Sequence, residues 1–70
     1  QRLFEEAIYE YRQAVRFNPN FSSAYYWLGR IYYERGNYQE AVSNWKQVLR
    51  LEPENTKAAY WLMQAEKQLK

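Results

Sequence analysis

The feature that most constrains this chain is an internal repeat with a period of 34 positions. Pro19 and Pro53 are separated by this distance, and so are Trp27 and Trp61. Other identical pairs on the same offset are Ala7/Ala41, Ala24/Ala58, Tyr26/Tyr60, Leu28/Leu62, Glu6/Glu40, Gln13/Gln47 and Arg16/Arg50. The alignment needs no gap. One period running through 70 residues predicts a stack of similar units, each packed on its neighbours.

Helix-breaking residues divide the chain into four segments. A residue that precedes proline is disfavoured in the helical region, and proline itself is tolerated only near a helix start. One helix therefore ends and another begins around Pro19, and again around Pro53. Gly36 suits the left-handed position just past a helix end, and Asn37 with Glu40 has the pattern of a capping box. The sequence predicts helices over residues 2–17, 22–35, 38–51 and 55–69.

The second predicted helix, residues 22–35, carries a broader apolar face than a surface helix needs. At about 100° per residue, its apolar positions spread over more than half of the circumference. This breadth predicts packing neighbours on two sides. Gly29 lies within the apolar arc, where it permits close helix approach despite a cost of about 1 kcal/mol in helix propensity.

A helix–turn–helix unit of this length, with these residues, resembles the tetratricopeptide repeat. In the first helix of the motif, the matching residues are Tyr25, Leu28, Gly29 and Tyr32. In the second helix they are Tyr38, Ala41, Trp45 and Val48, where Val48 replaces the usual alanine, followed by Pro53. The earlier copy supplies Phe4, Ala7, Tyr11, Ala14 and Pro19. The resemblance covers residues 1–70 and implies an all-α, right-handed α-α solenoid of antiparallel helix pairs.

The four helices are expected in the order second, first, second, first (B-A-B-A). Residues 1–21 form the second helix of a partial repeat, 22–55 one complete repeat, and 56–70 a further first helix. In that last helix, Met63 and Glu66 stand where the complete repeat has Gly29 and Tyr32. Both replacements make this face of the helix less suitable for packing against a following helix. We therefore predict a terminal capping helix, the alternative being a degenerate internal repeat.

The resemblance implies that the first helices line a concave groove that binds a protein or peptide partner. The candidate binding residues on these helices are Tyr26, Arg30, Tyr33, Lys57, Tyr60 and Gln64. Tyrosine and arginine are enriched at interface hot spots, and Arg30 with Lys57 would suit a carboxylate. The alternative is an ordinary solvated face. Trp27 and Trp61, at the edge of the apolar arc, are expected to pack between adjacent first helices.

Composition excludes several classes of function. The chain has no histidine and no cysteine, and all its acidic residues are glutamate. A catalytic triad, a thiolate nucleophile and the common metal centres are therefore missing. We expect no enzyme activity, no metal and no cofactor. A net charge of +2 is too weak to favour nucleic acid or an anionic membrane. The lack of cysteine suits the cytoplasm and the bacterial periplasm equally, so the localisation stays open.

Two functions follow as hypotheses. The first is a protein-interaction scaffold that binds a peptide or partner protein on its concave face. The alternative is self-association, because helix 2–17 shows no change that would blunt its outer face and is expected to be covered by something missing here. One molecule would then complete the half-repeats of another in trans, an assembly against which Met63 and Glu66 argue.

Overall fold

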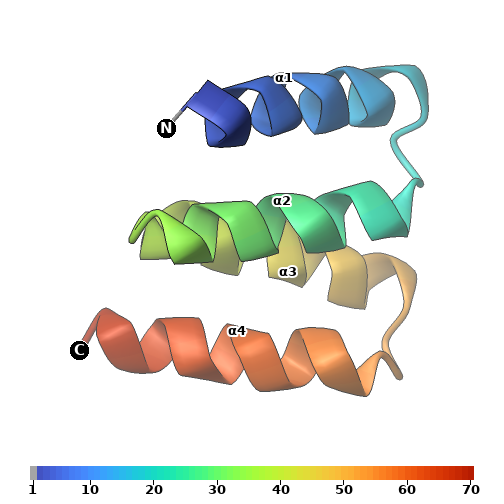
Figure 1. The fold of residues 1–70 in the computed structure, drawn as a ribbon. Coiled ribbons are helices and arrows are strands. Elements are labelled where there is room, and N and C mark those ends of the chain that lie inside the picture. The colour runs from blue at the N-terminus through green and yellow to red at the C-terminus, as the bar shows by residue number, and fades with distance from the viewer. Residues whose placement is uncertain (1) are drawn as a thin grey trace.

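The computed structural model describes residues 2–70, which form four α-helices and no strand. The helices are α1 (Arg2–Phe17), α2 (Ser22–Glu34), α3 (Tyr38–Leu51) and α4 (Thr56–Gln68). Every boundary lies within one residue of its predicted position. Consecutive helices run antiparallel, and Figure 1 shows α1, α2 and α4 stacked in one direction with α3 behind α2. The predicted all-α helical repeat solenoid is confirmed.

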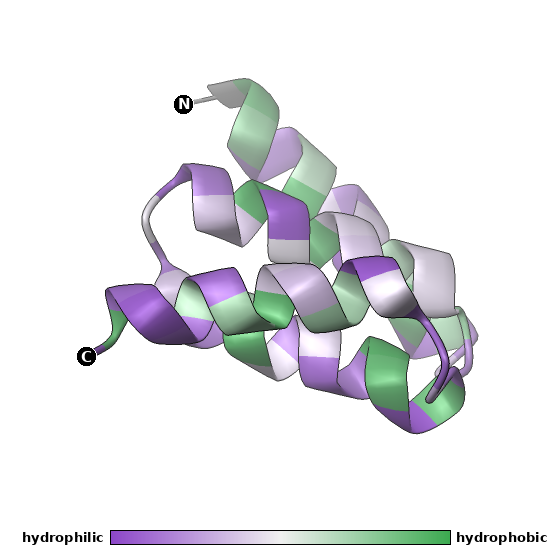
Figure 2. Ribbon diagram, turned by 90° about the horizontal axis from the view of Figure 1, so that it is seen from below, coloured by the Kyte–Doolittle hydropathy of each residue, from purple (hydrophilic) through white to green (hydrophobic). Residues whose placement is uncertain are grey.

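The helices form two layers. The most extensive contact joins α2 to α3, followed by the contacts of α3 with α4 and of α1 with α2. The Cα trace measures 29 × 27 × 14 Å, as expected for a flat stack of two helix layers about 8–10 Å apart. In Figure 2, apolar and polar residues alternate along every helix, so each one has both an apolar and a polar side.

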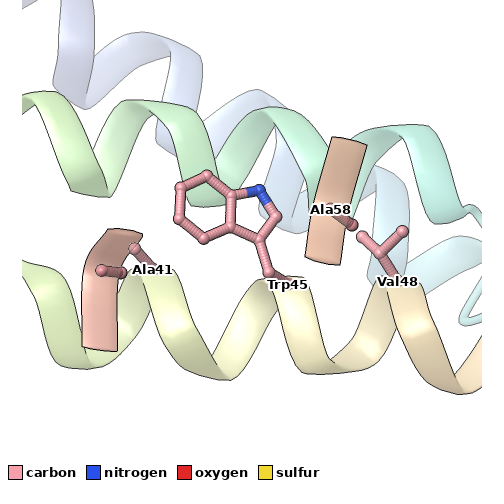
Figure 3. Close-up of a cluster of buried hydrophobic side chains, with 5 residues drawn as sticks. Ala41, Trp45, Val48 and Ala58 are labelled. Atoms are coloured by element: carbon pink, nitrogen blue, oxygen red, sulfur yellow. The ribbon is translucent and has the colours of Figure 1, made fainter. Parts of the chain in front are cut away.

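The core is built on one stripe of α3, formed by Ala41, Trp45 and Val48. Trp45 is 0 % exposed, and its ring lies between α3 and α2 (Figure 3). Its indole Nε1–H donates a hydrogen bond of 3.2 Å to the backbone carbonyl of Tyr26. A β-carbon on Gly29 would lie 2.5 Å from two atoms of this ring. The close approach predicted at Gly29 is therefore confirmed, with Trp45 as the neighbour.

The turn between α2 and α3 confirms one sequence prediction and corrects another. Gly36 has φ +82°, and the Asn37 N–H bonds to the Tyr32 carbonyl at 2.8 Å, as in a Schellman ending. The capping box at Asn37 is wrong, because its side chain forms no capping hydrogen bond. The backbone of Asn37 already completes the end of α2, with ψ 72°. Asn55, which precedes α4 and has ψ 99°, does form a side-chain cap: its side chain accepts a hydrogen bond from the Ala58 N–H at 2.9 Å.

Candidate partner-binding surface

The ring of Trp61, in α4, lies beneath the predicted partner-binding surface and contacts residues of α2 and α3. Its ring stacks on Trp45 at 6.1 Å between centroids and meets the edge of Tyr33 at 5.5 Å. Trp61 therefore packs between α4 and α2, as expected. Tyr33 also contacts the rings of Tyr38 and Trp45. The ring of Tyr33 thus belongs to the packing of three helices and contributes less to the binding surface than the sequence suggested.

Arg30 of α2 lies above the same indole ring. Its guanidinium carbon is 4.5 Å from the centroid of the Trp61 ring, a distance suited to a cation–π contact. Its Nε atom is buried and has no hydrogen-bond partner among the described residues. The aromatic face of Trp61 therefore restrains the position of the guanidinium. A guanidinium carries five N–H donors, and those of Arg30 form no hydrogen bond within the described part of the chain.

The other four predicted residues lie around this contact on α2 and α4. Tyr60 is 55 % exposed, with its ring edge-on to Trp61 at 5.3 Å. Tyr26 is half-buried, and together with the exposed Lys57 it lines a shallow cavity of about 190 Å³. Gln64 is half-buried one turn beyond Tyr60. Arg30 and Tyr60 thus both contact the ring of Trp61, and Tyr26 and Lys57 line the same cavity.

The sequence analysis missed the polar residues that line the cavity beside Lys57. The hydroxyl of Ser22 donates to Glu52 Oε2 at 2.7 Å, and the amide of Asn55 donates to Glu52 Oε1 at 2.9 Å. All three residues line the cavity. Ser22 and Glu52 are 30 positions apart, so no local motif signals their contact. The negative charge of Glu52 disfavours an anionic group of a ligand in this cavity. Arg30 is therefore better placed than Lys57 to donate a hydrogen bond to an acceptor of the ligand.

The same hydrogen bonds affect the pKa of Glu52. The pKa lies below its ordinary value of 4.5, chiefly because Ser22 donates to the carboxylate and secondly because Asn55 does. The folded state therefore holds Glu52 ionised more strongly than the unfolded state does. This contribution to stability is complete above the ordinary pKa and is lost as the pH falls through the lowered value.

Glu52→Gln is expected to flatten the acid side of the stability profile. The variant should lose less of its urea midpoint between about pH 7 and about pH 3 than the unchanged chain does. Glu54→Gln is the matched control, because Glu54 is exposed and lies two residues away. Equal acid sensitivity of the Glu52 variant and the unchanged chain would contradict the hydrogen-bonded carboxylate.

Trp27 does not make the packing expected of it. It is 46 % exposed, and its described ring contact is with the adjacent Tyr26 at 5.4 Å. The physical reason is that no first helix lies on this side of α2 in residues 2–70. Together with Phe4, Ile31 and Arg30, Trp27 lines an open cavity of about 370 Å³.

Two further observations bear on the function classes. Over residues 2–70, no helix combines the length and apolar character needed to cross a membrane. In the same part of the chain, no three side chains of the histidine, cysteine, aspartate or glutamate type are grouped so that they could hold a metal ion.

Two family models match overlapping parts of the chain. One, described as TPR repeat, matches residues 4–34, and the other, described as Tetratricopeptide repeat, matches residues 22–55. No curated protein matches the chain significantly. Such repeats are in general protein–protein interaction modules and not enzymes. The internal period, the helix pairs and these matches agree, and the chain belongs to the tetratricopeptide repeat family.

Proposed function

We propose that the surface formed by α2 and α4 binds an extended peptide segment of a partner protein. The observation that carries the proposal is the guanidinium of Arg30, stacked on Trp61 without a hydrogen bond to any described residue. Tyr60, whose ring contacts Trp61, and Tyr26 supply aromatic surface on α4 and α2, and Gln64 and Lys57 add polar groups along α4.

The stacked arginine is suited to binding because its position is set before the partner arrives. A long side chain normally loses rotamer freedom when it is immobilised at an interface, at a cost of about 0.5–1.5 kcal/mol. Trp61 already restrains Arg30, so part of this rotamer entropy is lost when the chain folds and not when the partner binds. The planar donor array matches a carboxylate or a pair of carbonyl oxygens. We therefore expect the bound segment to present an acidic side chain or a chain-terminal carboxylate to Arg30.

The test uses a displayed library of random peptides about a dozen residues long, selected against the 70-residue chain. The triple variant Tyr26→Ala/Arg30→Ala/Tyr60→Ala should bind the selected peptides at least about a hundredfold more weakly, since hot-spot residues each contribute 2 kcal/mol or more. Its helicity by circular dichroism should stay unchanged. The matched control is Tyr9→Ala/Arg16→Ala/Phe17→Ala, which removes two exposed aromatic residues and one exposed arginine from α1.

Two results would contradict the proposal. One is a selection that yields no peptide with specific binding. The other is an equal loss of affinity in the α1 control and in the triple variant of α2 and α4, because the contact would then lie outside the proposed surface.

A second candidate function is self-association, which the exposure of Trp27 favours. A large aromatic side chain at the edge of the stack adds to the apolar surface that a second molecule would cover.

A further inference from the structure

We infer that Glu52 is a positioning residue for the proposed binding surface, because it joins the start of α2 to the start of α4 and so holds Trp61 against Arg30. Ser22, Glu52 and Asn55 together form the carboxylate cluster. The inference rests on the proposed function, since it describes how the chain prepares that surface before a peptide binds. Glu52 acts through the contact of Arg30 with Trp61, and not through a contact of its own with the peptide.

The carboxylate cluster connects three helices at one side chain. Glu52 directly follows α3, and its Oε2 accepts a hydrogen bond of 2.7 Å from the hydroxyl of Ser22, the first residue of α2. Its Oε1 accepts a hydrogen bond of 2.9 Å from the amide of Asn55, the residue before α4. Hydrogen bonds to a carboxylate are stronger than those between neutral groups. The starts of α2 and α4 are therefore linked through Glu52.

Asn55 uses both ends of its side-chain amide. The oxygen accepts from the Ala58 N–H at 2.9 Å and caps α4, and the nitrogen donates to Glu52 at 2.9 Å. A capping side chain that is held at one end can still rotate, whereas this one is held at both ends. The carboxylate cluster therefore fixes the direction in which α4 leaves the turn.

Core packing restrains α4 less than it restrains α2. Helix α2 is fixed on α3 by the close approach of Gly29 to the ring of Trp45, and the contact of these two helices is the most extensive in the fold. The residues of α4 that are fully buried are Ala58 and Ala65, whose methyl groups form no large ridge to pack into a groove of α3. The link at the start of α4 therefore adds to the restraint on its rotation, and so to the position of Trp61.

The carboxylate cluster lies about two helical turns from the contact of Arg30 with Trp61. Helices α2 and α4 run in the same direction (Figure 1). From Ser22 to Arg30, and from Asn55 to Trp61, the axial distances are about 12 Å and about 9 Å at the usual rise per residue. Backbone hydrogen bonds keep a helix stiff over such a length. A displacement at the cluster therefore alters the contact of 4.5 Å between the guanidinium carbon and the indole ring.

The consequence for binding concerns the freedom of the Arg30 side chain. Its Nε is buried and has no hydrogen-bond partner among the described residues, so the stack on Trp61 is the described interaction that restrains the guanidinium. When the ring of Trp61 moves away, Arg30 regains rotamer freedom, which it must lose again on binding a peptide. This loss corresponds to roughly threefold to tenfold in affinity.

The first measurement needs no peptide. In a nitrogen–proton correlation spectrum, the ring current of Trp61 should shift the Nε–H signal of Arg30, which Arg30→Lys assigns by its disappearance. Glu52→Leu and Ser22→Ala should move this signal toward the position of exposed arginines, whereas Ser22→Thr keeps the hydroxyl and should retain the shift. Glu54→Leu is the matched control, at an exposed glutamate two residues away, and should leave the signal in place.

The second measurement compares affinities for the tightest of the selected peptides by titration calorimetry. Glu52→Leu should weaken binding roughly threefold to tenfold, and Glu54→Leu should leave the affinity unchanged. In a chain that already carries Arg30→Ala, Glu52→Leu should have no further effect, because no guanidinium remains to be positioned. A direct contact of Glu52 with the peptide, or a general loss of structure, would lower the affinity in both backgrounds.

Circular dichroism establishes that each variant is folded at the temperature of the measurement. If Glu52→Leu is unfolded, Ser22→Ala replaces it in both measurements, since that variant keeps the hydrogen bond between Glu52 and Asn55. Its affinity should fall in the presence of Arg30 and stay unchanged in the Arg30→Ala background.

Two results would overturn the inference. One is an Arg30 signal that stays in place in the folded variants of the carboxylate cluster. The other is an equal loss of affinity with and without Arg30. A failure of the proposed function is distinguishable from both, because a chain for which no peptide can be selected still shows the Arg30 signal and its response to Glu52→Leu and Ser22→Ala.

Discussion

Gly29→Ala is expected to destabilise the chain by about 1–3 kcal/mol, although alanine is the better helix former by about 1 kcal/mol. The added β-carbon would lie 2.5 Å from Cε2 and Nε1 of Trp45 and 2.8 Å from Cδ1. These atoms belong to a rigid ring that is 0 % exposed, so the ring has no free space into which it could move. Helices α2 and α3 must separate, and their contact is the most extensive in the fold.

Two companion variants separate this collision from other effects of a glycine substitution. Gly36→Ala meets no atom within 4 Å, so its cost should be only the backbone strain at φ +82°, about 1–2 kcal/mol. Trp45→Phe removes part of the ring and should relieve the collision, so the double variant with Gly29→Ala should lose less than the two single losses added together. Urea unfolding followed at the helical dichroism band measures the four variants and the unchanged chain. A Gly29→Ala chain more stable than the unchanged one would contradict the close approach.

Trp45→Ala is expected to cost about 3–5 kcal/mol and to leave most of the population unfolded at 25 °C, because a domain of this size has little stability to spare. The substitution empties a fully buried site and removes the stacking partner of Trp61. It also leaves the carbonyl of Tyr26 without the indole donor at 3.2 Å. These losses fall on α2, α3 and α4 together.

The matched control for that variant is Trp27→Ala, which makes the same chemical change at a residue that is 46 % exposed. Its cost should be well below that of Trp45→Ala, at about 1 kcal/mol. Both variants are compared with the unchanged chain by thermal and urea unfolding. Similar costs at the two positions would contradict the assignment of Trp45 to the centre of the core.

Most of the fold could be predicted from the sequence because its determinants are local or periodic. Pro19 and Pro53 break helices wherever they stand, Gly36 supports the left-handed turn at φ +82°, and the period of 34 relates the remaining elements. The capping box predicted at Asn37 is wrong because Asn37 lies between two helices, and its backbone takes part in the hydrogen bond that ends α2. The sequence pattern of a capping box considers only the helix that follows, so it does not include the role of Asn37 at the end of the preceding helix.

The candidate surface was predicted less completely, because it depends on which side chains meet across helices. Periodicity placed Arg30, Tyr26 and Tyr60 on the first helices, but it does not set the rotation of α4 against α2. The stack of Arg30 on Trp61 and the use of Tyr33 in internal packing follow from that rotation. The contact of Ser22 with Glu52 joins a helix start to a turn and has no sequence signature.

The most direct test of the proposed binding surface is a nitrogen–proton correlation spectrum recorded while a selected peptide is added to the labelled chain. The chain has three tryptophans, which give three separate indole N–H signals. We predict that the Trp61 indole and the backbone amides around Arg30 and Tyr60 move most, since the peptide covers the guanidinium stacked on that ring. Shifts concentrated on α1 and the outer side of α3, with the Trp61 signal unmoved, would contradict the account.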